Sequence, residues 1–465
     1  MISRAKRFTF AVLLACTACG SSERAPPATR TAFIGLNVVD VETETVRPEQ
    51  TIIIEDDTII YVGAAEDARE LIAEETGELA GAFVVPGLWD AHVHIRGGDQ
   101  AIDANAAWLA RYTAHGVVHV RECGTDMPGA VQAFNHAIDQ GSLVGPRIHS
   151  SMRKVDGPRF GMGGWGAIRL EAPSDAGPAL DELEASGAYF VKLHEASIDR
   201  DNYLAVLQEA ERRGLKTAGH IPPSVSFDEA LEAGLDGFEH ANILLKGASR
   251  SAEELRALAE QSYQTTGEYD GVYRYQAHFE RLDWSVLDES LQKMVDRGVA
   301  LTPTLAPVDL SDPQALEDHA EFQYVPGVIR VSWQGRIDRA ARQLAAPSRY
   351  QQAIDDLSFQ LTRRAHQAGV MIMAGSDTGA YNSFRYPGAA LNNELASLAR
   401  AGLSPWDALR AATLHPATWL GVEDRYGSIA AGKSADLVFL NRDPTVDIGN
   451  LRGIRAVISQ GRRLR

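Results

Sequence analysis

The sequence contains few cysteines and no excess of positive charge. Only 3 of its 465 residues are cysteine, too few for a disulfide-stabilised framework. Lys and Arg total 45 against 62 Asp and Glu, which gives a formal net charge of -17. Because an acidic surface repels nucleic acid and anionic lipid, we expect neither as a partner.

Long hydrophobic runs are also missing, since no stretch approaches the roughly 20 apolar residues of a membrane-spanning helix. The apolar run at residues 8–15 is short, follows a positively charged start, and precedes Cys16 and Cys19. This arrangement resembles a bacterial lipoprotein signal, in which a cysteine after a small residue is acylated. We expect export to the periplasmic side of a bacterial membrane, with a lipid on Cys16 or Cys19 as the only membrane contact. An ordinary cleaved signal peptide is the alternative.

Apolar residues make up 45% of the chain and charged residues 23%, a composition that excludes global disorder. Strand-like runs occur near both ends of the chain, around a long middle in which short apolar strands alternate with helical stretches. We predict an α/β fold: a distorted (β/α)8 TIM barrel at 86–403 and a small flanking β-sandwich at 32–85 and 404–465. Residues 1–31 are predicted to form the signal and a tether.

The predicted barrel strands end near eight positions, and the spacing between successive strand ends is about that of the βα repeat of a TIM barrel. These positions are His94, Cys123, Ser150, Lys192, His220, His240, Leu305 and Asp377. Two long gaps then contain insertions, at about 246–284 and 308–350. Both follow strand ends, so we expect them either to cover the active-site face as a lid or substrate wall, or to pack as extra helices outside the barrel.

Metal-binding side chains coincide with several of these strand ends. His92 and His94 alternate along one strand and therefore share a face. Further candidate ligands follow four other apolar strands, and active sites of TIM barrels lie at this end. The predicted metal site consists of His92, His94, Lys192, His220, His240 and Asp377.

Lys192 has an unusual place in this set, because an ammonium group beside metal ions would be repelled. A neutral lysine amine can instead react with carbon dioxide to give a carbamate, which could bridge two metal ions. The alternative is a lysine that pairs with Glu195 or extends outward.

The constellation resembles the amidohydrolase superfamily in its binuclear form with a carboxylated lysine. The matching segments are PGLWDAHVH, VKLH, AGHIPPSVS, GFEHA, LTPTL and AGSDTG. The resemblance implies two divalent metal ions, with zinc expected, and a carbamate on Lys192 that bridges them. It implies that His92 and His94 bind the more buried ion together with Asp377, and that His220 and His240 bind the second. It also implies a distorted (β/α)8 barrel with a flanking β-sandwich.

This resemblance predicts hydrolysis of a C–N amide bond by a metal-bridging hydroxide, with Asp377 as general base and then acid. The most similar group is that of imidazolonepropionase and the Xaa-Pro and Xaa-Arg dipeptidases, so a dipeptide or an N-acyl amino acid is the expected substrate. The loops after Lys192 and His220 depart from the dipeptidase pattern. A phosphotriesterase or lactonase, and a non-catalytic solute-binding lipoprotein, are the alternatives.

Four residues are candidates for binding a substrate carboxylate: Arg153, Lys154, Tyr381 and Arg385. Arg153 and Lys154 follow the third predicted strand, and the other two follow Asp377. The alternative is that they are solvated loop residues. The sequence leaves open whether the protein forms a homo-oligomer.

Overall fold

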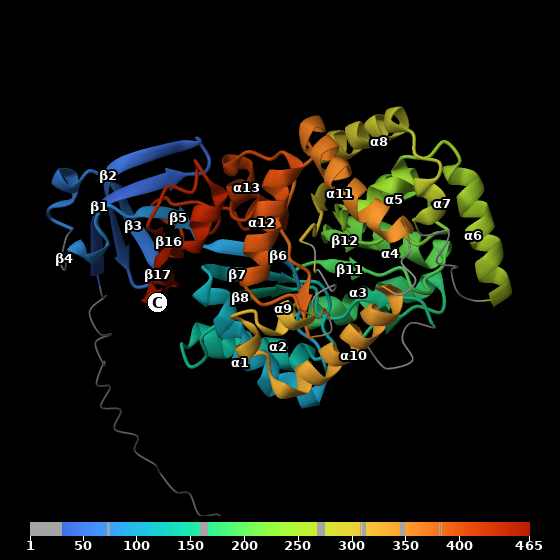
Figure 1. Cartoon of the computed structure of the whole chain (residues 1–465), viewed down its shortest axis with the longest axis horizontal. Helices are drawn as coiled ribbons and strands as arrows, with labels where there is room; N and C mark the ends of the chain where they lie inside the picture. The colour runs from blue at the N-terminus through green and yellow to red at the C-terminus, as the bar shows by residue number, and fades with distance from the viewer. Residues whose placement is uncertain are drawn as a thin grey trace, which may run out of the picture.

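The structure is a computed structural model (Figure 1). It describes residues 30–71, 75–158, 166–266, 275–306, 308, 313–344, 349–380, 382 and 384–465. No helix among these residues is long and apolar enough to cross a membrane. Cys16, Cys19 and Tyr381 lie outside the described residues, so lipidation, export and a substrate contact by Tyr381 stay predictions.

Strands from the two ends of the chain form one eight-stranded sheet, seen where blue and red strands meet in Figure 1. Its order is β18-β17-β16-β5-β1-β2-β3, and β4 pairs with β1. Alternate apolar residues such as Leu36 and Val38 are fully buried on one face, against Leu437 and Phe439 from the C-terminal part. The strands are β1 (Arg30–Asp40), β2 (Thr45–Glu55), β3 (Thr58–Gly63), β4 (Glu75–Thr76), β5 (Phe83–Pro86), β16 (Leu437–Leu440), β17 (Ile454–Ser459) and β18 (Arg462–Arg463).

The middle of the chain forms two sheets whose described strands all pair in parallel. The first has the order β15-β6-β7-β8 and the second β10-β9-β11-β12-β13-β14. Their strands are β6 (Leu88–His94), β7 (Val117–Glu122), β8 (Arg147–Ser150), β9 (Val155–Asp156), β10 (Ile168–Arg169), β11 (Val191–Leu193), β12 (Thr217–Gly219), β13 (Gly237–Glu239), β14 (Ala300–Thr302) and β15 (Thr378–Gly379). The mixed α/β fold with parallel strands is therefore confirmed.

Backbone hydrogen bonds connect the two parallel sheets at both edges. The amide of Tyr189, two residues before β11, donates to the carbonyl of Ser150 in β8 at 2.9 Å. On the other side, the amide of Leu301 in β14 donates to Met371, and the amide of Ala91 in β6 donates to Ala374. Residues 371–374 therefore lie between β14 and β6. Together with the short β15 they occupy the place at which the eighth strand was predicted.

Amphipathic helices with clear end signals follow these strands. Ser226 and Glu229 form a capping box at the start of α5, and Gly214 ends α4 in the left-handed conformation that glycine adopts without strain. The helices here are α1 (Ile102–Ala114), α2 (Pro128–Asp139), α3 (Ala176–Ala185), α4 (Arg200–Arg213), α5 (Phe227–Glu232), α8 (Trp284–Arg297), α11 (Arg349–Ala368), α12 (Ala389–Ala401), α13 (Pro405–Ala411) and α14 (Leu414–Leu420).

Both insertions touch loops that follow parallel strands. The first contains α6 (Ala252–Thr266) and α7 (Gln276–Phe279), and its Tyr263 hydroxyl donates to the carbonyl of Ser197, beyond the end of β11. The second contains α9 (Pro313–Glu317) and α10 (Gly327–Leu344). Its buried Trp333 donates from Nε1 to the carbonyl of Ala380, just after β15, at 2.8 Å. The insertions therefore pack beside the loops at the carboxyl ends of the strands.

Candidate metal centre and active site

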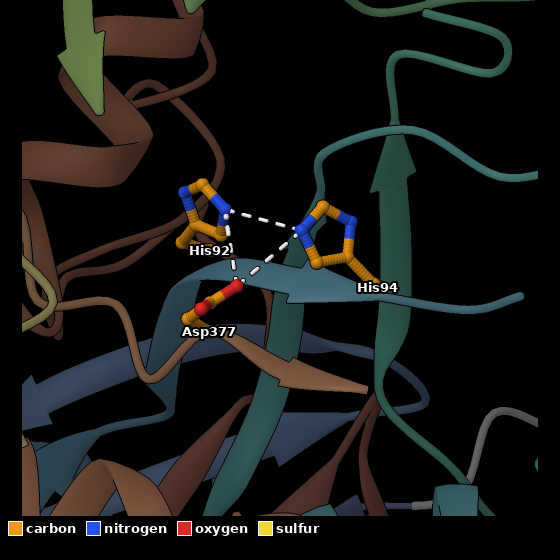
Figure 2. A group of neighbouring side chains, drawn as sticks. All are labelled: His92, His94 and Asp377. Carbon is orange, nitrogen blue, oxygen red and sulfur yellow. Dashed lines mark hydrogen bonds and ion pairs between the residues drawn. The ribbon is translucent and has the colours of Figure 1, made fainter. Parts of the chain in front are cut away.

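Two histidines and an aspartate bring three ligand atoms together at the end of β6. His92 and His94 share one face of this strand, and Asp377 directly precedes β15, which pairs with β6. The Nε2 atoms of the two histidines lie 3.3 Å apart. Asp377 Oδ1 lies 3.6 Å from Nε2 of His92 and 3.4 Å from Nε2 of His94. Figure 2 shows the three atoms facing one another.

This spacing fits a metal ion. Zinc holds nitrogen and oxygen ligands at about 2.0–2.2 Å in a tetrahedral arrangement, which places neighbouring ligand atoms roughly 3.4 Å apart. The separations of 3.3, 3.4 and 3.6 Å found here match that value. Imidazole and carboxylate donors also suit zinc and other divalent metals of similar softness. The spacing of the three side chains is thus one that could hold a metal ion.

The other predicted ligands lie at the ends of the neighbouring strands. The ring centroid of His240, directly after β13, lies 5.0 Å from that of His92. The ring of His220, directly after β12, lies 5.0 Å from that of His240. Lys192, in β11, is 1% exposed, and its charge acts on both of these rings. The structure therefore brings all six predicted ligand residues into one contiguous group.

Unpartnered polar atoms in this group fit metal coordination. Among the described residues, Nζ of Lys192 and both ring nitrogens of His220 have no hydrogen-bond partner. A buried polar atom left without a partner costs about 1–3 kcal/mol, so native proteins rarely keep several together. Metal coordination at His220 and a carbamate on Lys192 would satisfy these atoms.

The backbone is held in uncommon conformations at two of the ligands. The φ angle is 69° at His240 and 56° at Asp377, in the left-handed region that side chains other than glycine rarely adopt. Hydrogen bonds fix both: His240 Nδ1 lies 2.7 Å from the Thr304 hydroxyl, and Nδ2 of Asn382 lies 2.6 Å from both the carbonyl oxygen and Oδ1 of Asp377. The direction of each ligand is therefore determined by its surroundings.

Burial and neighbouring charges set the protonation states. Burial raises the pKa of Asp377, but the hydrogen bond to His94 and nearby positive charges outweigh it and hold this pKa well below its usual range. Burial, and next the positive charge of His92, lowers the pKa of His240 to about 4. Burial also places the pKa of His220 well below its usual value. At neutral pH these groups are a carboxylate and neutral imidazoles, as metal binding requires.

Lys154 and Arg385 lie beside this group. Lys154 is 4% exposed, and its positive charge acts on His94. Burial, and then the charges of Arg96 and Lys192, lower the pKa of Lys154 to about 8. Arg385 donates from Nη1 to the carbonyl of Ser376 at 2.7 Å, and its charge acts on Asp377. Both therefore remain candidates for holding a substrate carboxylate.

Arg153 is placed differently. Its guanidinium donates to the carboxylate of Glu182 at 2.7 Å and to the carbonyls of Gly166 and Ala167 at 2.8 and 2.9 Å. These contacts tie Arg153 to α3 and to the segment before β10. The structure gives it no contact with the predicted ligands.

Sequence reasoning missed several charged residues around the site. Glu239 and Arg121 are fully buried behind His92, and Asp156 accepts a hydrogen bond from Nδ1 of His194 at 2.7 Å. The ring of His194 lies 5.1 Å from that of His220. A charged residue inside a short apolar strand, as in GFEH and VVHVRE, is the signal that could have pointed to the first two.

Comparison with known proteins gives a consistent picture. The profile of the amidohydrolase family matches residues 83–464. The alignment with ochratoxinase from Aspergillus niger shows 21% identity over 459 residues. This alignment covers 87% of this chain and 80% of that protein. Among solved structures, a putative prolidase from Bifidobacterium longum is 23% identical with a TM-score of 0.62, and 93% of this chain and 94% of that chain are covered. A Xaa-Pro dipeptidase with methionine bound in its active site is 18% identical with a TM-score of 0.61, with 94% and 99% covered.

Proposed function

This chain belongs to the amidohydrolase family and is a hydrolase that acts on C–N bonds. We propose that it uses two divalent metal ions to cleave the amide bond of small substrates with a free carboxylate. The observation that carries the proposal is the convergence of His92, His94 and Asp377 on one point, next to His240, His220 and Lys192. A dipeptide or an N-acyl amino acid is the proposed substrate.

The ligand residues divide into two groups by position. His92, His94 and Asp377 would hold one ion, and His220 and His240 the other, with a carbamate on Lys192 between them. Bound metal ions of this kind polarise a carbonyl group and lower the pKa of water. Zinc is the expected metal, because the donor set consists of imidazoles and carboxylates.

Asp377 carries the proton transfer in this proposal. As a carboxylate of low pKa it accepts a proton from the attacking water, and it then delivers that proton to the leaving nitrogen as the C–N bond breaks. Asn382 restrains the carboxylate of Asp377 through the hydrogen bond to Oδ1. The backbone amide of Asp377 also donates a hydrogen bond to the carbonyl of His92 at 2.8 Å. This restraint keeps the proton acceptor beside the ligand atoms.

The substrate carboxylate is assigned to the positive charges beside His94 and Asp377. Lys154 and Arg385 come from the loops after β8 and β15, so they approach the group of ligands from different strands. Two relatives support this class of substrate: one dipeptidase structure holds methionine, and a prolidase structure holds N-methylphosphonate-L-proline. Both ligands are amino acids or amino acid derivatives.

We also propose that β6, β7, β8, β11, β12, β13 and β14, with residues 371–374 as the eighth strand, form one distorted barrel. The hydrogen bonds from Tyr189 to Ser150, from Leu301 to Met371 and from Ala91 to Ala374 support this arrangement, because they join the sheets at both edges. The barrel would occupy residues 86–403, with the sheet from both chain ends as its flanking domain.

A substrate panel tests the proposal. The zinc-loaded protein is assayed with dipeptides, N-acyl amino acids, their C-terminally amidated forms, a phosphotriester and a lactone. The proposal predicts the highest kcat/KM for amides with a free carboxylate. Preference for the phosphotriester or the lactone would contradict it, and so would the absence of turnover on every member.

A further inference from the structure

The ring nitrogen of His92 that faces away from the other ligands has a partner of its own. Nδ1 of His92 lies 2.6 Å from Oε2 of Glu239, the last residue of β13. The side chain of His92 is 1% exposed and that of Glu239 is 0% exposed. Because an ionised carboxylate only accepts hydrogen bonds, Nδ1 is the donor, and in the neutral form of His92 that binds a metal the lone pair resides on Nε2.

Arg121, in β7, holds Glu239 from the other side. Its Nη2 atom donates to Oε1 of Glu239 at 2.7 Å and to the hydroxyl of Thr302 at 2.9 Å, and its Nε atom donates to the carbonyl of Ala91 at 2.6 Å. The guanidinium is fully buried and also lies 4.8 Å from the centre of the Trp419 ring. One side chain therefore links the strands β6, β7, β13 and β14.

This arrangement has a consequence for the ligand atoms. With Nδ1 fixed as the donor, Nε2 of His92 presents its lone pair at 3.3 Å from Nε2 of His94 and 3.6 Å from Oδ1 of Asp377. A carboxylate that orients a metal-binding histidine in this way selects the tautomer and makes the imidazole a better ligand. Neither Arg121 nor Glu239 touches the point on which these atoms converge.

We propose that Arg121 and Glu239 are positioning residues that fix the tautomer and the direction of His92, so that the metal site next to Asp377 is formed before the metal arrives. This inference rests on the proposed metal centre. Its competitor is a buried ion pair that only stabilises the fold. Another competitor places the metal next to Cys123, because Cys123, Glu239 and His92 also offer ligand atoms that lie within 4.8 Å of one another.

Zinc binding at equilibrium separates these alternatives. The whole protein is stripped of metal and titrated with Zn²⁺ against a chelating indicator, as wild type and as Glu239→Gln, Thr302→Val and Cys123→Ala. Glu239→Gln keeps the shape of the side chain but lets it accept only one of the two hydrogen bonds. We expect it to weaken one of the two Zn²⁺ sites by about 10–100-fold. Thr302→Val removes a single contact of Arg121, and we expect it and Cys123→Ala to bind Zn²⁺ as the wild type does.

Two further measurements keep the test decisive if Glu239→Gln unfolds. The double variant Arg121→Met with Glu239→Gln leaves no unpaired charge, and it should show the same selective loss of one site with a folded circular dichroism spectrum. Nitrogen-15 NMR of the metal-free wild type at a pH where His92 is neutral, with His92→Asn for assignment, should show the proton on Nδ1 and none on Nε2.

The possible failures are distinguishable. Wild-type Zn²⁺ binding by Glu239→Gln, or a His92 protonated at Nε2, would overturn the positioning role and leave the proposed function standing. Loss of one Zn²⁺ in Cys123→Ala would overturn the positioning role by placing the ion on Cys123, Glu239 and His92. A wild type that binds no Zn²⁺ would overturn the proposed function itself.

Discussion

The Oδ1 atom of Asp377 lies 3.4 Å from the Nε2 atom of His94, at the point where β15 pairs with β6. Since this carboxylate is assigned the proton transfer, Asp377→Asn should lower kcat by about 10³-fold or more while the protein stays folded. Steady-state kinetics and circular dichroism check this result. Asp201→Asn, at an exposed aspartate in α4, is the matched control and should retain full activity. Near-normal turnover in Asp377→Asn would remove Asp377 from the mechanism.

Two adjacent cationic residues, Arg153 and Lys154, provide a matched pair for testing the substrate carboxylate. Lys154→Met should raise KM for an N-acyl amino acid by about 10–100-fold, the effect of losing a hydrogen bond to a charged group, and should leave the amidated analogue unaffected. Arg153→Met should leave KM for both substrates unchanged, because Arg153 donates a hydrogen bond to Glu182. If Lys154→Met raised KM equally for both substrates, the assignment would be contradicted. The same holds if Arg153→Met raised KM for the N-acyl amino acid as much as Lys154→Met does.

The same lysine predicts a pH dependence of binding. Burial lowers the pKa of Lys154 to about 8, so this side chain loses its charge as the pH rises through that value. KM for the carboxylate substrate should therefore rise between pH 7 and 9, whereas KM for the amidated analogue stays level. A parallel rise for both substrates would assign the titration to another group.

His119 and His149 form a pair of buried histidines outside the candidate metal centre, and this pair predicts how the free energy of unfolding depends on pH. Nε2 of His149 lies 3.4 Å from Nδ1 of His119, whose Nε2 lies 3.2 Å from the Asp436 carboxylate, and the ring of His149 stacks on Trp89 at 4.6 Å. Burial places the pKa of His149 well below 6.5 in the folded protein. The unfolded chain therefore binds the extra proton below about pH 6.5, and stability is lost as the pH falls.

The free energy of unfolding should consequently drop between pH 7 and pH 5 by up to about 1.4 kcal/mol per pH unit more in the wild type than in His149→Asn. Urea unfolding at the two pH values measures this difference. The variant is expected to be less stable at pH 7, because it loses the stacked ring. Identical pH slopes in the two proteins would show that His149 is not responsible.

The placement of the candidate ligand residues could be predicted because it follows from local rules. Alternation along β6 puts His92 and His94 on one face, and parallel strands bring their carboxyl ends to the same edge. The pairing of Arg121 with Glu239 could not be predicted, because it crosses the interior between β7 and β13, which are not neighbours in either sheet. Only the three-dimensional register of the strands decides which buried charges meet.

Arg153 and Lys154 show the same limit on a smaller scale. The sequence presents them as equivalent neighbours after a strand, yet Lys154 turns into the buried group around His94 and Arg153 turns toward Glu182 on α3. The eighth strand was also expected to continue to Asp377. Instead Asp377 has a φ of 56°, which interrupts regular strand geometry directly before β15 and turns its carboxylate toward the histidines.

The metal content per chain tests the central claim most directly. The wild type, Lys192→Ala and the control Lys216→Ala, at an exposed lysine paired with Asp236, are expressed with zinc and bicarbonate and compared by elemental analysis. The bridged centre predicts about two metal ions per chain in the wild type and the control, and one or fewer in Lys192→Ala. One metal ion in all three proteins would contradict the carbamate bridge and direct the search toward substrates of single-metal hydrolases.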